Sequence, residues 1–305
     1  MARYESVLQL IGGTPLLHLR RLEEAEGLGG RVYAKLERNN PGGSAKDRVA
    51  LAMLEEALRS GALRKGMPIV EPTSGNTGVG LAMVCAYLGF ELLLTMPDSM
   101  SKERRDLLAA YGARLVLTPA EKGMQGAVDE ANRLVKQLNG FCPSQFDNPA
   151  NPAAHRATAE EIFEDLQDEV AALVACVGTG GTLCGSARAL KARIPDLWTA
   201  AVEPAESPLL SGGQAGPHGI QGIGANFIPG NYDASVVDEV LCVSTEEAGA
   251  FCRRLAREEG LLCGISSGAA VCAALSLAGQ ERFADKNIVC VLPDTGERYL
   301  SSGVF

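Results

Sequence analysis

A short apolar run, a loop rich in glycine or hydroxyl side chains and a helical segment follow one another repeatedly along this chain of 305 residues. The runs expected to form strands are 68–71, 91–96, 114–118, 172–177, 200–203 and 288–292. The segments expected to form helices are 79–88, 101–111, 126–138, 183–192 and 245–259. Such an alternation is typical of parallel sheets that are covered by helices on both faces.

The repeating units fall into two clusters that separate near 148–151. This grouping predicts an α/β protein with two doubly wound domains, and 46% hydrophobic residues are enough to fill their cores. Ligands of open α/β sheets usually bind at the carboxyl ends of the strands. The cleft between the two domains is therefore the expected site.

The formal net charge is -9, and the sequence contains no block of Lys or Arg. These features argue against nucleic acid or an anionic membrane surface as a partner. No apolar stretch reaches membrane-spanning length, and residues 1–19 lack the basic and apolar segments of a secretion signal. The nine cysteines include no C-x-x-C pair. We expect unpaired thiols in a reducing compartment, and hence a cytoplasmic protein.

The segment Asn40–Arg48 places a lysine at an unfavourable position. Pro41 and two glycines predict a loop, and Ser44 followed by Asp47 is typical of a capping box that starts a helix. Lys46 then lies in the first turn, where a cation costs about 0.3–1 kcal/mol because of the helix dipole. The same dipole should lower its pKa and favour the free amine that Schiff-base chemistry needs. Taken alone, the segment is more simply explained by an exposed lysine that extends into water.

A glycine-rich loop follows the predicted strand 172–177 and opens the next helix. Its residues are Gly178, Thr179, Gly180, Gly181 and Thr182. Backbone N–H groups, two hydroxyls and the positive end of a helix dipole form an anion site suited to a phosphate. A turn needed only for tight packing is the alternative. An NAD site is not favoured, because Leu183 stands where a G-x-G-x-x-G motif requires glycine.

A second loop of this kind follows the predicted strand 68–71, and its residues are Thr73, Ser74, Gly75, Asn76, Thr77 and Gly78. Its hydroxyls, its amide and the free N–H groups of a helix start suit a carboxylate. Ordinary helix capping is the alternative. Together with Lys46 and the 178–182 loop, this segment could hold a carboxylate, an aldehyde carbon and a phosphate in one site.

The sequence of 264–268, Gly-Ile-Ser-Ser-Gly, matches the G-x-S-x-G nucleophile elbow of serine hydrolases. That fold needs an acidic residue and then a histidine after the serine. The chain has only His18, His155 and His218, and none of them follows Ser266. A hydrolase is therefore not favoured, and the histidines show no spacing typical of metal ligands.

Motifs along almost the whole chain resemble those of the fold-type II pyridoxal-phosphate enzymes, and among them the O-acetylserine sulfhydrylases. The matching segments are 11–16, 40–48, 71–78, 96–98, 103–105, 145–146, 178–182, 202–204, 219–224, 264–268 and 296–301. The resemblance implies a tryptophan synthase β-like fold with the site between two domains. The smaller domain would span 36–147, and the larger one would combine 1–35 with 148–305.

The resemblance also implies a role for each residue of the site. Lys46 would bind pyridoxal 5′-phosphate as a Schiff base, and the loop 178–182 would hold the phosphate. Asn76 would bond to the 3′-oxygen of the ring, and Ser266 would face the pyridine nitrogen. The residues implied for substrate binding are Thr73, Ser74, Gly75, Thr77, Gln145 and Gly222.

The reaction that the resemblance implies is a β-replacement. O-acetyl-L-serine would lose acetate to give an aminoacrylate, with Lys46 as the base, and sulfide would then add to give L-cysteine. The resemblance further implies a homodimer, and some members bind the C-terminal tail of serine acetyltransferase. Cystathionine β-synthase-like and serine dehydratase-like lyases remain alternatives, although dehydratases usually carry histidine at the position of Thr77. A catalytically silent binding module is the alternative outside the enzymes.

Overall fold

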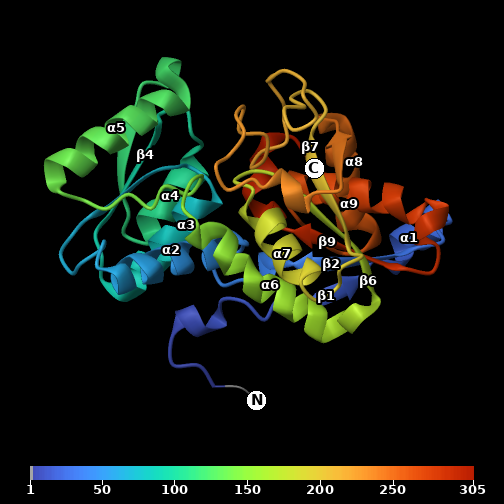
Figure 1. The fold of residues 1–305 in the computed structure, drawn as a ribbon. Coiled ribbons are helices and arrows are strands. Elements are labelled where there is room, and N and C mark those ends of the chain that lie inside the picture. Colours follow the sequence, from blue (N-terminus) through green and yellow to red (C-terminus); the bar gives the residue numbers. More distant parts are fainter. Residues whose placement is uncertain (1–2) are drawn as a thin grey trace.

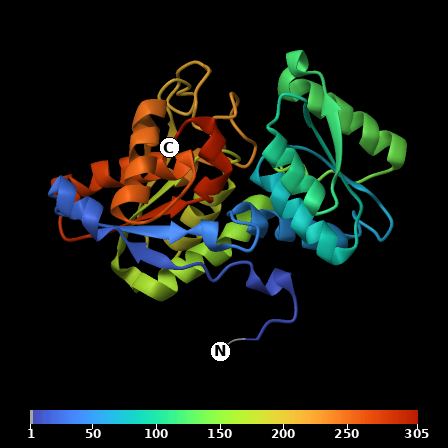
Figure 2. The same cartoon turned by 180° about the vertical axis from the view of Figure 1, so that it is seen from behind.

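The computed structural model describes residues 3–305, which form two β-sheets that lie side by side with helices on their faces (Figure 1, Figure 2). In spatial order, the six-stranded sheet consists of β1 (Leu16–His18), β2 (Arg31–Leu36), β9 (Asn287–Leu292), β6 (Val170–Cys176), β7 (Trp198–Pro204) and β8 (Glu239–Val243). The three-stranded sheet consists of β3 (Ile69–Pro72), β4 (Leu92–Pro97) and β5 (Arg114–Thr118). The α-helices are α1 (Arg20–Glu26), α2 (Lys46–Ser60), α3 (Asn76–Leu88), α4 (Lys102–Ala110), α5 (Gly123–Leu138), α6 (Ala150–Leu166), α7 (Gly181–Lys191), α8 (Thr245–Glu258) and α9 (Ile265–Ala278).

Alternate residues of the central strands of the larger sheet face different helices. Ala172 and Val174 of β6 pack with α8 and α9, whereas Leu173 and Ala175 pack with α6 and α7. A strand that is buried on both faces requires this period of two. The sheet is parallel except for β1, a short edge strand that pairs antiparallel with β2. The sequence did not predict β1, β2 or β8.

The smaller sheet is parallel throughout and has a core of its own. Ile69 and Leu94 pack with α2 and α3 on one face, and Val70 and Leu93 pack with α5 on the other. Three apolar residues of segment 7–11 also pack against the α2–α3 side, where they bury apolar surface. Segment 7–11 thus contacts the smaller sheet, and the boundaries implied for the two domains stay a prediction.

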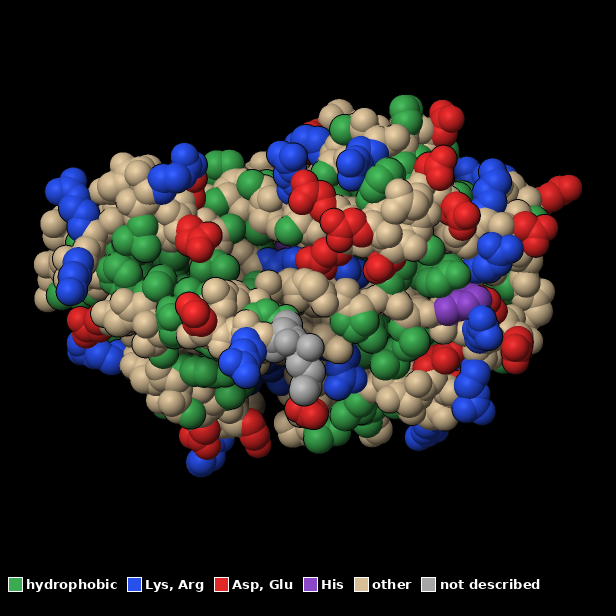
Figure 3. All heavy atoms as spheres, turned by 90° about the horizontal axis from the view of Figure 1, so that it is seen from below, with side chains coloured by type: hydrophobic (Ala, Val, Ile, Leu, Met, Phe, Trp, Pro, Cys, Tyr) green, Lys and Arg blue, Asp and Glu red, His purple; other side chains and the backbone are tan. Residues whose placement is uncertain are grey.

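The sequence located the strands that it predicted to within two residues at each end. It did not predict α1, α6 or α9. Helix α9 is buried and apolar around almost its whole circumference and so lacks a helical period. Within residues 3–305, no helix combines the length and the apolarity needed to cross a membrane. On the face seen in Figure 3, acidic and basic side chains are interspersed, and neither kind forms a continuous patch.

Candidate active site

Residues from both sheets line a cavity of about 320 Å³ at the carboxyl ends of β3, β6 and β9. This volume and position suit a small organic ligand of an α/β protein. The predicted site residues that line the cavity are Lys46, Thr73, Ser74, Gly75, Asn76, Thr77, Gln145, Gly178, Thr179, Gly180, Thr182, Gly222 and Ser266. Gly181 is the one predicted residue that does not line it. The structure thus brings together segments that are more than 200 residues apart in the sequence.

Lys46 is the first residue of α2, and its side chain lines the cavity. Within residues 3–305, its amine has no hydrogen-bond or ion-pair partner. Burial lowers the pKa of Lys46, and the carboxylates of Asp294 and Glu37 offset only part of this effect. The predicted direction of the shift is confirmed. Its main cause is desolvation.

The capping box predicted around Lys46 is wrong. Asp47 accepts a hydrogen bond from the N–H of Gly42 at 2.6 Å, and Ala45 rather than Ser44 is the residue before the helix. The N–H of Ala45 donates to the carbonyl of Pro293 at 2.8 Å. The loop is therefore tied to the end of β9, which shifts the start of α2 by one residue and brings it beside the larger sheet.

The loop 178–182 leaves β6 and starts α7. Gly180 has a φ of 82°, and a Cβ on Gly178 would lie 2.3 Å from the carbonyl oxygen of Gly222, so both positions require glycine. Of the hydrogen bonds among residues 3–305, none is donated by the backbone N–H groups of 178–180. These free donors at the N-terminus of a helix fit a phosphate group.

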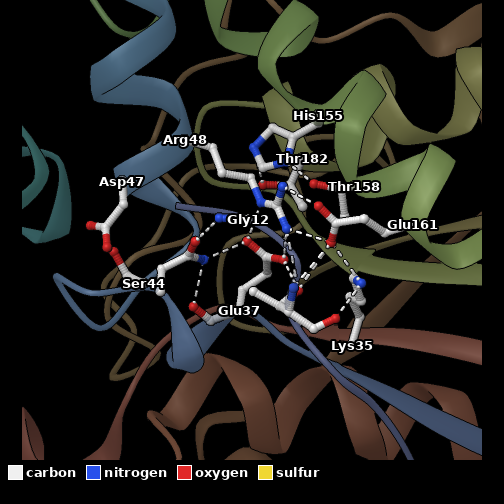
Figure 4. A network of polar contacts seen from close by, with 12 residues as sticks. Gly12, Lys35, Glu37, Ser44, Asp47, Arg48, His155, Thr158, Glu161 and Thr182 are labelled. Carbon is white, nitrogen blue, oxygen red and sulfur yellow. Dashed lines mark hydrogen bonds and ion pairs between the residues drawn. The ribbon is translucent and has the colours of Figure 1, made fainter. Parts of the chain in front are cut away.

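Two buried side chains of α6 fix the threonine hydroxyls of this loop. Asn151 Nδ2 donates to Thr179 Oγ1 at 2.9 Å. His155 Nε2 lies 3.1 Å from Thr182 Oγ1 (Figure 4). Burial lowers the pKa of His155 well below its ordinary value, so the imidazole is neutral. A Cβ on Gly181 would lie 1.9 Å from Asn151 Oδ1, which makes Gly181 a packing glycine.

The loop that follows β3 is joined to Gln145 across the cavity. The hydroxyl of Thr77 donates to Gln145 Oε1 at 2.5 Å, and the N–H of Gly75 donates to Thr73 Oγ1 at 3.2 Å. α3 begins at Asn76, so its first N–H groups lie beside these hydroxyls. The group of donors suits a carboxylate, as the sequence predicted.

A segment near the C-terminus contributes residues that the sequence did not single out. Asn76 Nδ2 donates to Asp294 Oδ2 at 2.7 Å, and Arg298 donates to Asn76 Oδ1. Tyr299 donates its hydroxyl to Asp294 Oδ2 at 2.5 Å, while Asp294 Oδ1 is buried without a partner among residues 3–305. Burial raises the pKa of Asp294. The signals in the sequence were that Asp294 lies two residues after the predicted strand 288–292 and that segment 296–301 matches the family.

Ser266 lies in the first turn of α9 and lines the cavity, and its carbonyl oxygen accepts from Cys176 Sγ at 3.2 Å. The histidines are engaged elsewhere: His18 contacts Glu23, His155 contacts Thr158 and Thr182, and His218 contacts the carbonyl of Gly224. In the part of the chain that the structure describes, Ser266 therefore has no histidine as a base. The hydrolase alternative has no support in this geometry.

Arg48 lies two residues beyond Lys46, in a buried network of ion pairs (Figure 4). Its guanidinium bonds to Glu37 at 2.8 and 2.9 Å and to Glu161 at 2.7 Å, and Lys35 pairs with Glu161 at 2.8 Å. Burial alone would raise the pKa of Glu161, but the bonds and charges of Arg48 and Lys35 lower it to about 2. The network joins α2, β2 and α6 behind the cavity.

The fold and the site define a class of protein, and the family model described as pyridoxal-phosphate dependent enzyme matches residues 7–294. The chain belongs to this family of pyridoxal-phosphate dependent enzymes. A cysteine synthase from Staphylococcus aureus is 49% identical to it over 303 residues, which cover 99% of this chain and 97% of that protein.

Two solved structures place the chain more closely within the family. The crystal structure of a cysteine synthase from Entamoeba histolytica has a TM-score of 0.98 and 44% identity, covering 100% of this chain and 91% of that one. An O-acetylserine dependent cystathionine beta-synthase from Helicobacter pylori has a TM-score of 0.93 and 37% identity, with 100% of both chains covered.

Proposed function

We propose that this enzyme makes L-cysteine from O-acetyl-L-serine and sulfide by β-replacement, with pyridoxal phosphate as its cofactor. One observation carries the proposal: the unpaired amine of Lys46 lines the same cavity as the free N–H groups of 178–180 and the loop 73–77. The similarity to cysteine synthases over nearly the full length supports it.

When bound, pyridoxal phosphate supplies an aldehyde that condenses with amines and an electron sink for charge that develops at Cα of the substrate. Lys46 is suited to hold the aldehyde. The loop 178–182 is suited to hold the phosphate, and Asn76 and Ser266 are proposed to face the ring. The hydroxyl of Ser266 cannot hold a ring nitrogen protonated by charge pairing. The sink is then weaker, which favours loss of a leaving group that carries away the charge.

Residues of the chain bind the substrate, transfer a proton and exclude water. Thr73, Ser74, Thr77 and Gln145 bind and orient the substrate carboxylate, beside Gly75 and Gly222. The lowered pKa of Lys46 keeps a larger share of its amine free at neutral pH. This amine takes the proton from Cα as a general base and later returns it. Pro72 to Thr77 line the cavity from the proposed smaller domain, 36–147, and Gly222 lines it from the remainder, so closure of the two proposed domains would exclude water.

The compartment, the oligomeric state and a protein partner of the enzyme are also part of the proposal. All nine cysteines are free thiols, which favours a reducing compartment such as the cytoplasm. A homodimer and binding of a serine acetyltransferase tail are proposed from family resemblance. Size-exclusion chromatography coupled to light scattering tests the dimer, and titration with the tail peptide tests the second partner.

The reaction is tested by supplying O-acetyl-L-serine with sulfide and identifying the product by mass spectrometry. We expect L-cysteine and acetate in equal amounts, and no product from the Lys46→Ala variant. A second candidate is cystathionine formation, which the similarity to the Helicobacter pylori enzyme favours. A parallel reaction with homocysteine in place of sulfide separates the two: cystathionine without any cysteine would overturn the first proposal.

A further inference from the structure

Glu71 is a buried carboxylate outside the set of residues that line the cavity. It lies at the carboxyl end of β3, two residues before Thr73, and its exposed fraction is 1%. Its Oε2 accepts the N–H of Ser144 at 2.9 Å, and its Oε1 accepts the N–H of Gln145 at 3.2 Å. A single side chain thus bonds to two successive backbone donors of a loop from another part of the sequence.

The loop that Glu71 holds has no regular structure to fix it. Ser144 has a φ of 55°, in the left-handed region that a residue with a side chain rarely adopts. The carbonyl of Gln145 accepts from Asn151 at 2.7 Å and from Asn231 at 2.9 Å. The side chain of Gln145 is then free to face the cavity, where it accepts from Thr77.

We propose that Glu71 is a positioning residue that aligns the two halves of the carboxylate site, and this inference rests on the proposed function. One half, Thr73 to Thr77, continues directly from β3. The other half, Gln145, is anchored to β3 through the carboxylate of Glu71. Without that anchor, the strained backbone at Ser144 would relax and the amide of Gln145 would leave its place opposite Thr77.

The ionised form of Glu71 is the one that accepts both N–H groups. Burial raises its pKa to about 7, although the N–H groups of Gln145 and Ser144 and the thiol of Cys142 work in the opposite direction. The loop contributes Cys142 as a titratable neighbour, and burial raises the pKa of this thiol to about 11, so it stays neutral. β4 places Leu94 opposite Glu71, and the face of β3 that Ile69 and Glu71 share packs with apolar residues of α2 and α3. Protonation below pH 7 therefore removes an acceptor from the loop.

Glu203 provides a matched control in the larger sheet. It also precedes a proline at the end of a strand and has an exposed fraction of 2%. Its oxygens accept the N–H groups of Leu210 and Ser211 at 2.7 and 2.9 Å. Neither Leu210 nor Ser211 lines the cavity. The substitution Glu203→Gln therefore disturbs a loop that is also held through two backbone N–H groups by a buried glutamate, but that does not line the substrate cavity.

The experiment compares the Glu71→Gln and Glu203→Gln holoenzymes with the wild type. The first readout is the dissociation constant of propionate by ligand-observed NMR, because propionate is a carboxylate with no amine that titrates between pH 6 and pH 8. We expect Glu71→Gln to weaken propionate binding about tenfold at pH 8. We expect it to raise KM for O-acetyl-L-serine by a similar factor, with kcat within about twofold. Glu203→Gln should leave both constants unchanged.

The second readout needs no Glu71 variant. Wild-type and Glu203→Gln enzymes should bind propionate about fivefold more weakly at pH 6 than at pH 8, because the ionised share of Glu71 falls through this range. Equal effects of the two substitutions, or equal affinity at the two pH values in the wild type, would overturn the inference. Failure of the wild type to form cysteine would instead count against the proposed function alone.

Discussion

Lys46 and Arg48 are two cations in the first turn of the same helix, but their surroundings shift their pKa values in opposite directions. Arg48 bonds to two carboxylates, and these bonds outweigh the effect of burial and raise its pKa. Lys46 has no partner within residues 3–305, and burial lowers its pKa. Both positions are unfavourable for a positive charge at a helix start. The neighbouring carboxylates, and not the helix, decide which cation is structural and which amine is available for chemistry.

The largest expected effect is on catalysis at Lys46. We expect Lys46→Met to reduce cysteine formation by about 10⁴-fold, because both the attachment of the cofactor and the general base are lost. The substitution removes an amine that lines the cavity and has no partner within residues 3–305, so the free energy of unfolding of the apoprotein should be unchanged or higher. Steady-state kinetics and urea denaturation check the two halves of this prediction. A stable Lys46→Met variant with full activity would contradict the claim that Lys46 is the catalytic cation and Arg48 the structural one.

The same substitution at Arg48 should act mainly on stability. Arg48→Met leaves Glu37 without its cation and Glu161 with Lys35 alone, in a network that is largely buried. Breaking a buried ion pair in this way typically costs about 3–5 kcal/mol. Urea denaturation of the apoprotein measures the loss. If Lys46→Met destabilised the protein as much as Arg48→Met does, the contrast between the two sites would be wrong.

The network should also give the protein a stability that depends on pH. The pKa of Glu161 is lowered to about 2 in the folded state, from about 4.5 when unfolded. Its contribution, up to about 3 kcal/mol, is therefore fully present above the unfolded pKa and is lost as the pH falls towards 2. We expect the difference in stability between wild type and Glu161→Gln to shrink from pH 6 to pH 3. A constant difference across this range would contradict the assignment.

The smallest effect is expected where a cation at a helix start is exposed. Lys102 is the first residue of α4, and its amine bonds to Asp106 at 2.5 Å on the surface. Exposed pairs of this kind contribute little, because solvent screens them. Lys102→Met should leave both the urea midpoint and the rate of cysteine formation unchanged. A measurable loss would show that burial is not what separates the three cations.

The comparison also explains what the sequence could predict. Six of the nine strands in residues 3–305, the glycine loops and the place of Lys46 in a first turn follow from local patterns, and these predictions are confirmed for the backbone. The contact of Arg48 with Glu161 and the contact of Asn76 with Asp294 join residues 113 and 218 positions apart. No local pattern encodes such contacts. The wrong capping box has the same origin, because the tie between Ala45 and Pro293 comes from another sheet.

Sodium borohydride makes the link between an aldehyde cofactor and its lysine permanent, so peptide mass spectrometry of the reduced holoenzyme locates that lysine. We predict one modified peptide, with the cofactor mass on Lys46, and none on Lys35 or Lys102. Modification of a different lysine, or a holoenzyme that loses its cofactor completely after reduction, would contradict the role given to the unpaired amine.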